Sequence, residues 1–146
     1  INFTTNSQTI SGTHDIIFTG NTTISGGITV NFGGIGTTSC PVFSGAINGS
    51  SSSDIFNNIG TINYQNMASP MTIGKLYCNQ VANTFIYGLS GDQDIQIPSD
   101  PTSGYKNLTL QGSGAKKLLG SLSVKGNYTL VAPATLNSNG YTLTNP

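Results

Sequence analysis

Charge is scarce in this chain of 146 residues. Five Lys and five Asp supply all of the charged side chains, 7% of the residues, and there is no Arg, no Glu and no Trp. An average soluble domain carries about 25% charged residues. Long surface helices usually draw on Glu and Arg, so the absence of both argues against such helices. Arg is also the side chain best suited to bind phosphate and read guanine, which argues against nucleic-acid binding.

Long apolar runs and cysteines are also scarce. No run approaches the roughly 18 apolar residues that a membrane-spanning helix needs. The chain begins at Ile1 without a basic and apolar leader, so we expect a mature or excised segment whose targeting signal is missing. Cys40 and Cys78 are candidates for one disulfide if the protein is exported, and two separate buried thiols are the alternative.

Small polar and β-forming residues dominate instead. Gly (19), Thr (19), Ser (17) and Asn (16) make up nearly half of the chain, and 20 Ile and Val with 12 Phe and Tyr are spread along it. Short runs in which apolar and polar residues alternate predict strands with one buried face. We therefore predict a single all-β domain over residues 1–146. Examples of these runs are Ile28, Val30 and Phe32; Ile62 and Tyr64; Leu108 and Leu110; Leu122 and Val124; and Tyr141 and Leu143.

The two ends of the chain are similar to each other. A gapless comparison sets residues 8–32 against residues 108–132, with glycines and apolar positions in common. We predict related repeat units near 8–32 and 93–146, with an unmatched middle at 33–92. Such repeats predict a solenoid, in which stacked units complete each other's core. A competing alignment starts the unit elsewhere, pairing Gln8 and Ile10 with Gln93 and Ile95.

The turn signals leave two architectures open. The dipeptides at 26–27, 126–127 and 139–140 suit either hairpin turns or the corners of a β-helix, because both favour a positive φ. The leading prediction is a parallel β-helix or solenoid of short strands. The alternative is an antiparallel β-sandwich that forms an extracellular filament when a terminal strand, such as residues 1–5, completes a partner's sheet.

Charge is divided unevenly along the chain. Residues 1–97 hold four Asp and one Lys, a net charge of −3, whereas residues 98–146 hold four Lys and one Asp, a net charge of +3. Opposite signs favour head-to-tail contacts between copies of the chain or neighbouring repeats. Drift between two diverged repeats explains the same division without any contact.

The last third of the chain carries motifs of a known family. Residues 93–146 resemble the repeat units of very large secreted surface adhesins of the Bacteroidota, and residues 7–32 resemble them loosely. The resemblance implies a β-solenoid stalk at the cell surface with a structural and adhesive role and with no catalytic residues to transfer. The matching positions are Gln93 and Ile95; Tyr105 with Asn107, Leu108, Thr109 and Leu110; Gly112 to Gly114 with Lys116; Val124, Gly126 and Asn127; Thr129 and Leu130; and Gly140, Leu143 and Thr144.

Groups able to perform chemistry are few. His14 is the only imidazole, and although it lies beside Asp15, no nucleophile-elbow motif accompanies it. Asp92 and Asp94 are the closest pair of carboxylates, but a Ca²⁺ site would need a third carboxylate and a bidentate Glu. We therefore predict no enzymatic activity, no cofactor and no tightly bound metal. A sugar-cleaving β-helix, the remaining enzymatic alternative, would need its Asp residues to converge in one groove.

Aromatic residues offer a different kind of site. Tyr64, Tyr77, Tyr87, Tyr105 and Tyr141 are candidates for contacts with surface glycans, and core positions are the alternative for each because most belong to alternating apolar runs. Rows of Thr and Asn on a flat face would suit ice, but the Thr residues do not recur at a fixed spacing. The sequence thus favours a non-enzymatic, extracellular structural and adhesive module of a bacterial surface stalk or fibre.

Overall fold

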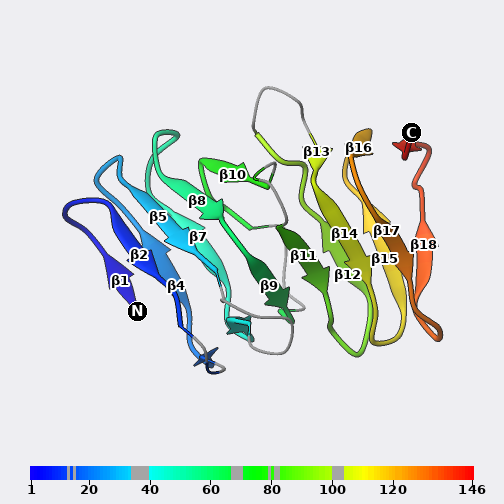
Figure 1. Ribbon diagram of the computed structural model, residues 1–146, viewed down its shortest axis with the longest axis horizontal. Coiled ribbons are helices and arrows are strands. Elements are labelled where there is room, and N and C mark those ends of the chain that lie inside the picture. The colour runs from blue at the N-terminus through cyan, green and yellow to red at the C-terminus, as the bar shows by residue number, and fades with distance from the viewer. Residues whose placement is uncertain are drawn as a thin grey trace.

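The computed structural model describes residues 1–12, 14, 16–33, 40–66, 71–78, 80, 83–99 and 104–146. These residues form 19 short strands and no helix. The strands are arranged as successive turns along one long axis, with the two ends of the chain at opposite ends of the stack (Figure 1). The all-β prediction is therefore confirmed.

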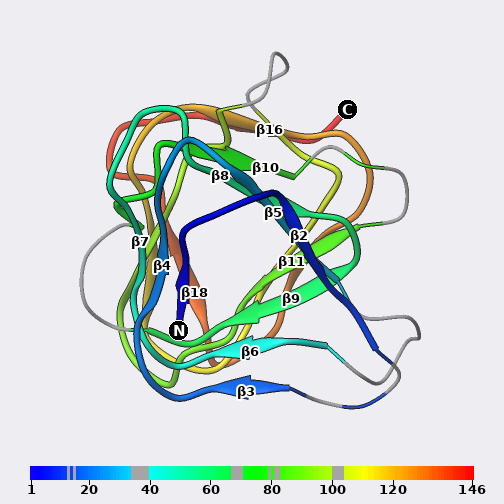
Figure 2. The ribbon, with the colours of Figure 1, turned by 90° about the vertical axis from the view of Figure 1, so that its left-hand side faces the viewer.

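Successive strands pass from one face of the stack to the next, and along the axis they outline a three-sided tube (Figure 2). Face 1 contains β1 (Asn2–Phe3), β4 (Thr22–Ile24), β7 (Ile47–Gly49), β12 (Gln93–Ile95), β15 (Ala115–Leu118) and β18 (Thr135–Asn137). Face 2 contains β2 (Gln8–Ile10), β5 (Thr29–Phe32), β8 (Ile55–Asn58), β10 (Lys75–Tyr77), β13 (Gly104–Tyr105), β16 (Leu122–Val124) and β19 (Leu143–Thr144). Face 3 contains β3 (Ile17–Phe18), β6 (Val42–Phe43), β9 (Thr61–Tyr64), β11 (Thr84–Tyr87), β14 (Asn107–Leu110) and β17 (Tyr128–Leu130).

Every described strand pair is parallel, which identifies the fold as a β-solenoid of about six turns. Face 3 is one continuous six-stranded sheet, whereas faces 1 and 2 are each divided into two sheets. The antiparallel β-sandwich is therefore wrong. The dipeptides that suggested hairpins do form turns, but each turn connects strands on two different faces. Each strand therefore pairs with strands of the neighbouring turns.

The length of a turn is not constant. Residues that pair across neighbouring turns are separated by as few as 19 positions, for Gly104 and Ser123, and by as many as 26, for Thr29 and Ile55. Corners and loops absorb the difference while the strands keep their hydrogen-bonded register. The repeat is therefore a repeat of structure, with only a loose period in sequence.

The similarity between residues 8–32 and 108–132 has an unexpected meaning. It places β2 on β14, β3 on β15, β4 on β16 and β5 on β17, so each strand matches a strand on the next face around the tube. Inward apolar residues and corner glycines recur on every face, and a gapless comparison detects that shared spacing. The repeat nature of the chain is confirmed, and the two aligned segments lie one face apart around the tube, whereas the bounds of the units near 8–32 and 93–146 stay a prediction.

The predicted turns are corners. Gly26 and Gly27, with φ of 86° and 72°, connect β4 on face 1 to β5 on face 2, and Asn139 and Gly140, with φ of 51° and 83°, connect β18 to β19. L-residues rarely adopt such φ values, which explains Gly and Asn at these positions. Residues 126–127 also form a corner, between β16 and β17, but without a positive φ, so that part of the prediction was wrong.

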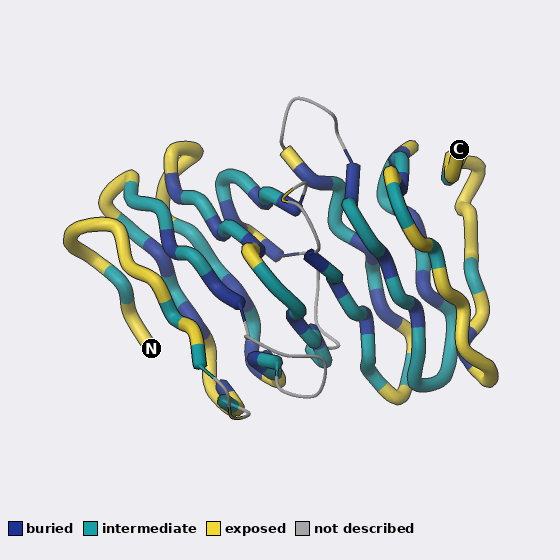
Figure 3. The backbone as a smooth tube through the Cα atoms, in the orientation of Figure 1, coloured by how far each residue is buried: buried dark blue, intermediate teal, exposed yellow. Residues whose placement is uncertain are grey.

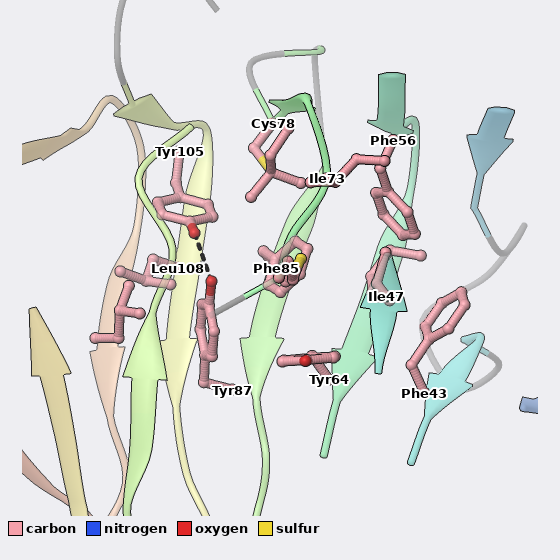
Figure 4. Close-up of a cluster of buried hydrophobic side chains, with 14 of the residues drawn as sticks. Phe43, Ile47, Phe56, Tyr64, Ile73, Cys78, Phe85, Tyr87, Tyr105 and Leu108 are labelled. Atoms are coloured by element: carbon pink, nitrogen blue, oxygen red, sulfur yellow. Dashed lines mark hydrogen bonds between the residues drawn. The ribbon is translucent and has the colours of Figure 1, made fainter. Parts of the chain in front are cut away.

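The core is a narrow column inside the tube, built from the inward residues of every turn (Figures 3 and 4). Phe residues dominate the first turns: the Phe18 and Phe43 rings stack with centroids 4.6 Å apart, and the Phe32 and Phe56 rings with centroids 4.5 Å apart. The Phe18–Phe43 stack follows directly from parallel register, because these two residues pair across β3 and β6. Phe32 is instead in register with Asn58, so its ring reaches Phe56 diagonally across β5 and β8.

Candidate functional site

The carboxylate of Asp54 has a structural role. Asp54 is buried just before β8, where it accepts hydrogen bonds from the backbone N–H groups of Gly27 (2.8 Å), Ser50 (2.7 Å) and Ser51 (2.7 Å). Burial acts to raise the pKa of this carboxyl, but the hydrogen bonds outweigh it and hold the pKa below its usual range. Asp54 thus ties together the corners of two successive turns.

The remaining candidates for catalysis and metal binding lie apart from Asp54. His14 is exposed between β2 and β3, while Asp92 and Asp94 lie on face 1 beside β12. Asp15 and Asp100 lie outside the described residues. Within the described residues, no group of three or more His, Cys, Asp or Glu side chains is placed to hold a metal ion.

Three of the five tyrosines predicted as glycan contacts are core residues. Tyr64, Tyr87 and Tyr105 are almost completely buried and present no surface to a sugar. Each stands at an inward position of its strand, as the alternating pattern requires. Tyr77 is half-buried, and Tyr141 is 43% exposed. Any glycan contact by these tyrosines therefore depends on Tyr77 and Tyr141.

Two of the buried hydroxyl groups form a closed ring of hydrogen bonds with the backbone N–H and C=O of one residue, Gln96. The Tyr87 and Tyr105 hydroxyl oxygens lie 2.7 Å apart (Figure 4). Gln96 N–H donates to the Tyr87 hydroxyl (3.0 Å), and the Tyr105 hydroxyl donates to Gln96 C=O (2.5 Å). The direction of the last bond requires Tyr87 to be the donor to Tyr105. Burial raises the pKa of Tyr87 well above its ordinary value, and the hydrogen bond with Tyr105 opposes this only in part.

The two cysteines occupy different faces. Cys40 is half-buried just before β6 on face 3, and Cys78 is buried just after β10 on face 2, among the core side chains of Figure 4. The disulfide between them stays a prediction. Intact mass after thiol alkylation, with and without prior reduction, measures it directly.

Sequence reasoning missed a buried cation. Lys116 of β15 is fully buried, and its Nζ donates to Leu89 C=O (2.7 Å), Gly91 C=O (3.0 Å) and Gln93 Oε1 (3.4 Å). Burial lowers the pKa of Lys116, and the charge of Asp92 opposes that effect. The signal was present in the sequence, since Leu118 points inward and the residue two positions earlier on a strand shares its face.

Sequence reasoning also missed a ladder of asparagines, which runs along the edge where face 2 meets face 3. Asn58 Nδ2 donates to Thr84 C=O (3.2 Å), Asn83 Nδ2 to Asn58 C=O (2.8 Å), and Asn107 Nδ2 to Asn83 C=O (2.7 Å). Asn107 Oδ1 in turn accepts the N–H of Asn127 (2.9 Å). These side chains satisfy backbone groups that a corner leaves without strand partners.

Outward side chains form rows across the turns. On face 3, Thr61 pairs with Thr84 and Thr109 pairs with Thr129, although the partners are 23 and 20 positions apart in sequence. Unequal sequence spacing was therefore the wrong reason to reject aligned threonines. The rows are nevertheless mixed, because Ile86 lies between Asn63 and Thr109.

Apolar side chains are exposed mainly in the first and last turns. Ile1 and Ile17 are each 62% exposed in the first turn, and Leu130, Val131 and Tyr141 are 42–44% exposed in the last (Figure 3). Inward apolar residues of these turns are only partly covered. These residues are Phe3, Ile10, Leu136 and Leu143.

The described part of the chain contains no helix with the length and hydrophobicity needed to cross a lipid bilayer. Comparison with protein-family models, with curated proteins and with solved structures yields no match for this chain.

Proposed function

We propose that this chain is a non-enzymatic structural module of an extracellular stalk or fibre, of the kind found in the secreted surface adhesins that residues 93–146 resemble. The observation that carries the proposal is the parallel stack, in which face 3 runs as one continuous six-stranded sheet from β3 to β17. A rod held by backbone hydrogen bonds along its axis is suited to mechanical reach.

The two end turns support the same role. Three strands at each end, β1, β2 and β3 at one and β17, β18 and β19 at the other, have an edge that no described strand covers. Core residues there, such as Phe3 and Leu136, are partly exposed. A further turn of similar construction, from a neighbouring repeat or another copy, would pair with these edges and cover these side chains. Nearly uncharged outward faces reduce the repulsion between such neighbours.

Electron microscopy of native material, combined with immunogold labelling of intact cells, tests the proposal. We expect label on the outer surface, on thin rods whose cross-section matches one three-sided turn. Label confined to the cell interior, or only isolated compact particles, would contradict it. A hydrolytic assay on oligosaccharides provides a second check, because the proposal expects no turnover.

A further inference from the structure

The outward side of face 1 has a hollow across its last three turns. Its volume is about 260 Å³, and it spans β12, β15 and β18. The lining residues are Asp92, Gln93, Asp94, Ala115, Lys117 and Asn137. This hollow is distinct from the buried tyrosines and from the corner held by Asp54.

The hollow arises from a small residue in the middle of the array. Asp94, Lys117 and Asn137 stand in register on the three strands, and in the neighbouring row Ala115 pairs with Thr135. Because Ala115 carries only a methyl group, it forms an apolar floor, and the longer polar side chains around it form the rim.

Hydrogen bonds hold the floor and one carboxylate of the rim in place. Ala115 N–H donates to Asp92 Oδ1 (2.8 Å), which fixes that carboxylate and leaves its other oxygen available to a ligand. The next residue, Lys116, points inward and binds the carbonyls of Leu89 and Gly91, just before Asp92. On the other side, Thr135 N–H donates to Gly114 C=O (3.0 Å). A site organised in this way loses little conformational entropy on binding.

We infer that this hollow binds one residue of a neutral sugar, an inference that rests on the proposed adhesive role. The carboxylates of Asp92 and Asp94 accept hydrogen bonds from hydroxyl groups, and Lys117 and Asn137 donate them. The Ala115 methyl contacts the C–H surface of the sugar ring. Charges of both signs around one small space favour a neutral polyol over a purely anionic or cationic ligand.

The size and composition of the hollow set the affinity. Its volume lies just below the roughly 300–1,000 Å³ of pockets for drug-sized ligands, which suits a single sugar ring. None of its described lining residues is aromatic, so stacking adds nothing, and we expect a Kd on the order of 1 mM for a monosaccharide. Repetition along a stalk would raise the overall avidity without any new contact.

Ala115→Leu tests the inference, because it fills the floor at an outward position without changing charge. The matched control is Thr109→Leu, at an outward position of β14 on face 3. The probes are immobilised oligosaccharides of glucose, galactose, mannose, xylose and N-acetylglucosamine, followed by methyl glycosides in an NMR titration of the positive sugar. We expect binding by the wild type and by Thr109→Leu, and at least tenfold weaker binding by Ala115→Leu at an unchanged melting temperature.

Asp94→Asn provides a second variant that leaves the floor intact. It removes one charged acceptor, and we expect several-fold weaker binding. The inference is overturned if no sugar in the panel binds or if Ala115→Leu binds as the wild type does. Surface-labelled rods without sugar binding would overturn this inference alone, whereas sugar binding by a protein confined to the cell interior would overturn the proposed stalk.

Discussion

The interior of the solenoid differs between residues 1–78, the N-terminal half, and residues 83–146, the C-terminal half. In the N-terminal half, Phe rings stack from turn to turn, with Phe32 packed against the rings of Phe18, Phe43 and Phe56. The C-terminal half replaces many of these rings with Leu and buries the long polar side chains of Gln93 and Lys116, whereas the polar side chains buried in the N-terminal half are short, those of Thr22, Asp54 and Asn58. Both interiors are enclosed by the same three-faced turns.

The difference shows how a solenoid accommodates polar residues inside its tube. Corners and loops direct carbonyl groups inward, so Lys116 finds the backbone oxygens of Leu89 and Gly91 as partners, and Tyr105 finds that of Gln96. A buried polar group costs little once it is hydrogen-bonded, and it permits only one register.

The largest expected effect is in the N-terminal half. Phe32→Ala would leave a cavity among four other rings, and we expect the free energy of unfolding to fall by about 3–5 kcal/mol. Phe32→Leu keeps much of the volume and should cost about 1.5 kcal/mol. Urea denaturation followed by circular dichroism measures both. A loss below about 1 kcal/mol for Phe32→Ala would show that the Phe column is not what stabilises this half.

A somewhat smaller effect is expected in the C-terminal half. Lys116→Met would leave the three oxygen partners of Nζ without a donor, so we expect a loss of about 2–3 kcal/mol. Lys117→Met, at the next position but half-exposed, should change stability by less than about 0.5 kcal/mol. The same denaturation assay applies. Equal effects of the two substitutions would contradict the role assigned to the buried ammonium.

The corner held by Asp54 makes the stability of the N-terminal half depend on pH in the acid range. The folded-state pKa of Asp54 is below its ordinary value of 3.8, so its stabilising contribution is complete above about pH 4 and is lost as the pH falls through the folded-state pKa. Asp54→Asn should cost about 1 kcal/mol at pH 7 and lack this part of the acid sensitivity. Melting temperatures between pH 2 and 7 test this, and identical pH profiles for the two proteins would refute it.

An effect as small as that of Asp54→Asn at pH 7 is expected at the ring of hydrogen bonds that joins Tyr87, Tyr105 and Gln96. Tyr87→Phe removes a hydroxyl that joins Gln96 N–H to Tyr105, so we expect a loss of about 1 kcal/mol. Tyr128→Phe is the control, because the buried Tyr128 hydroxyl has no hydrogen-bond partner among the described residues and its removal should be nearly neutral. If both substitutions prove neutral, the ring does not contribute to the stability of the C-terminal half.

The sequence predicted much of the fold and little of the site. Alternation around Ile62 and Leu108 predicted their inward positions, and Gly26 and Asn139 predicted corners. The polar hollow above Ala115 could not be predicted, because it depends on which residues of distant turns stand side by side. The burial of Lys116 could have been predicted from the alternation of β15, had its charge not argued for the surface.

By itself, the sequence determined that this protein is all-β, that its strands are short and that Gly and Asn stand at the corners, because φ preferences and side-chain alternation are local properties. Only the tertiary structure decided that the strands are parallel, that the repeats are rotated by one face and that Asp94 lies beside Lys117. The physical reason is that the turns are of unequal length, so residues that pair across neighbouring turns are separated by different numbers of positions in the sequence. Strand pairing depends on backbone hydrogen bonds between turns, which no local pattern specifies.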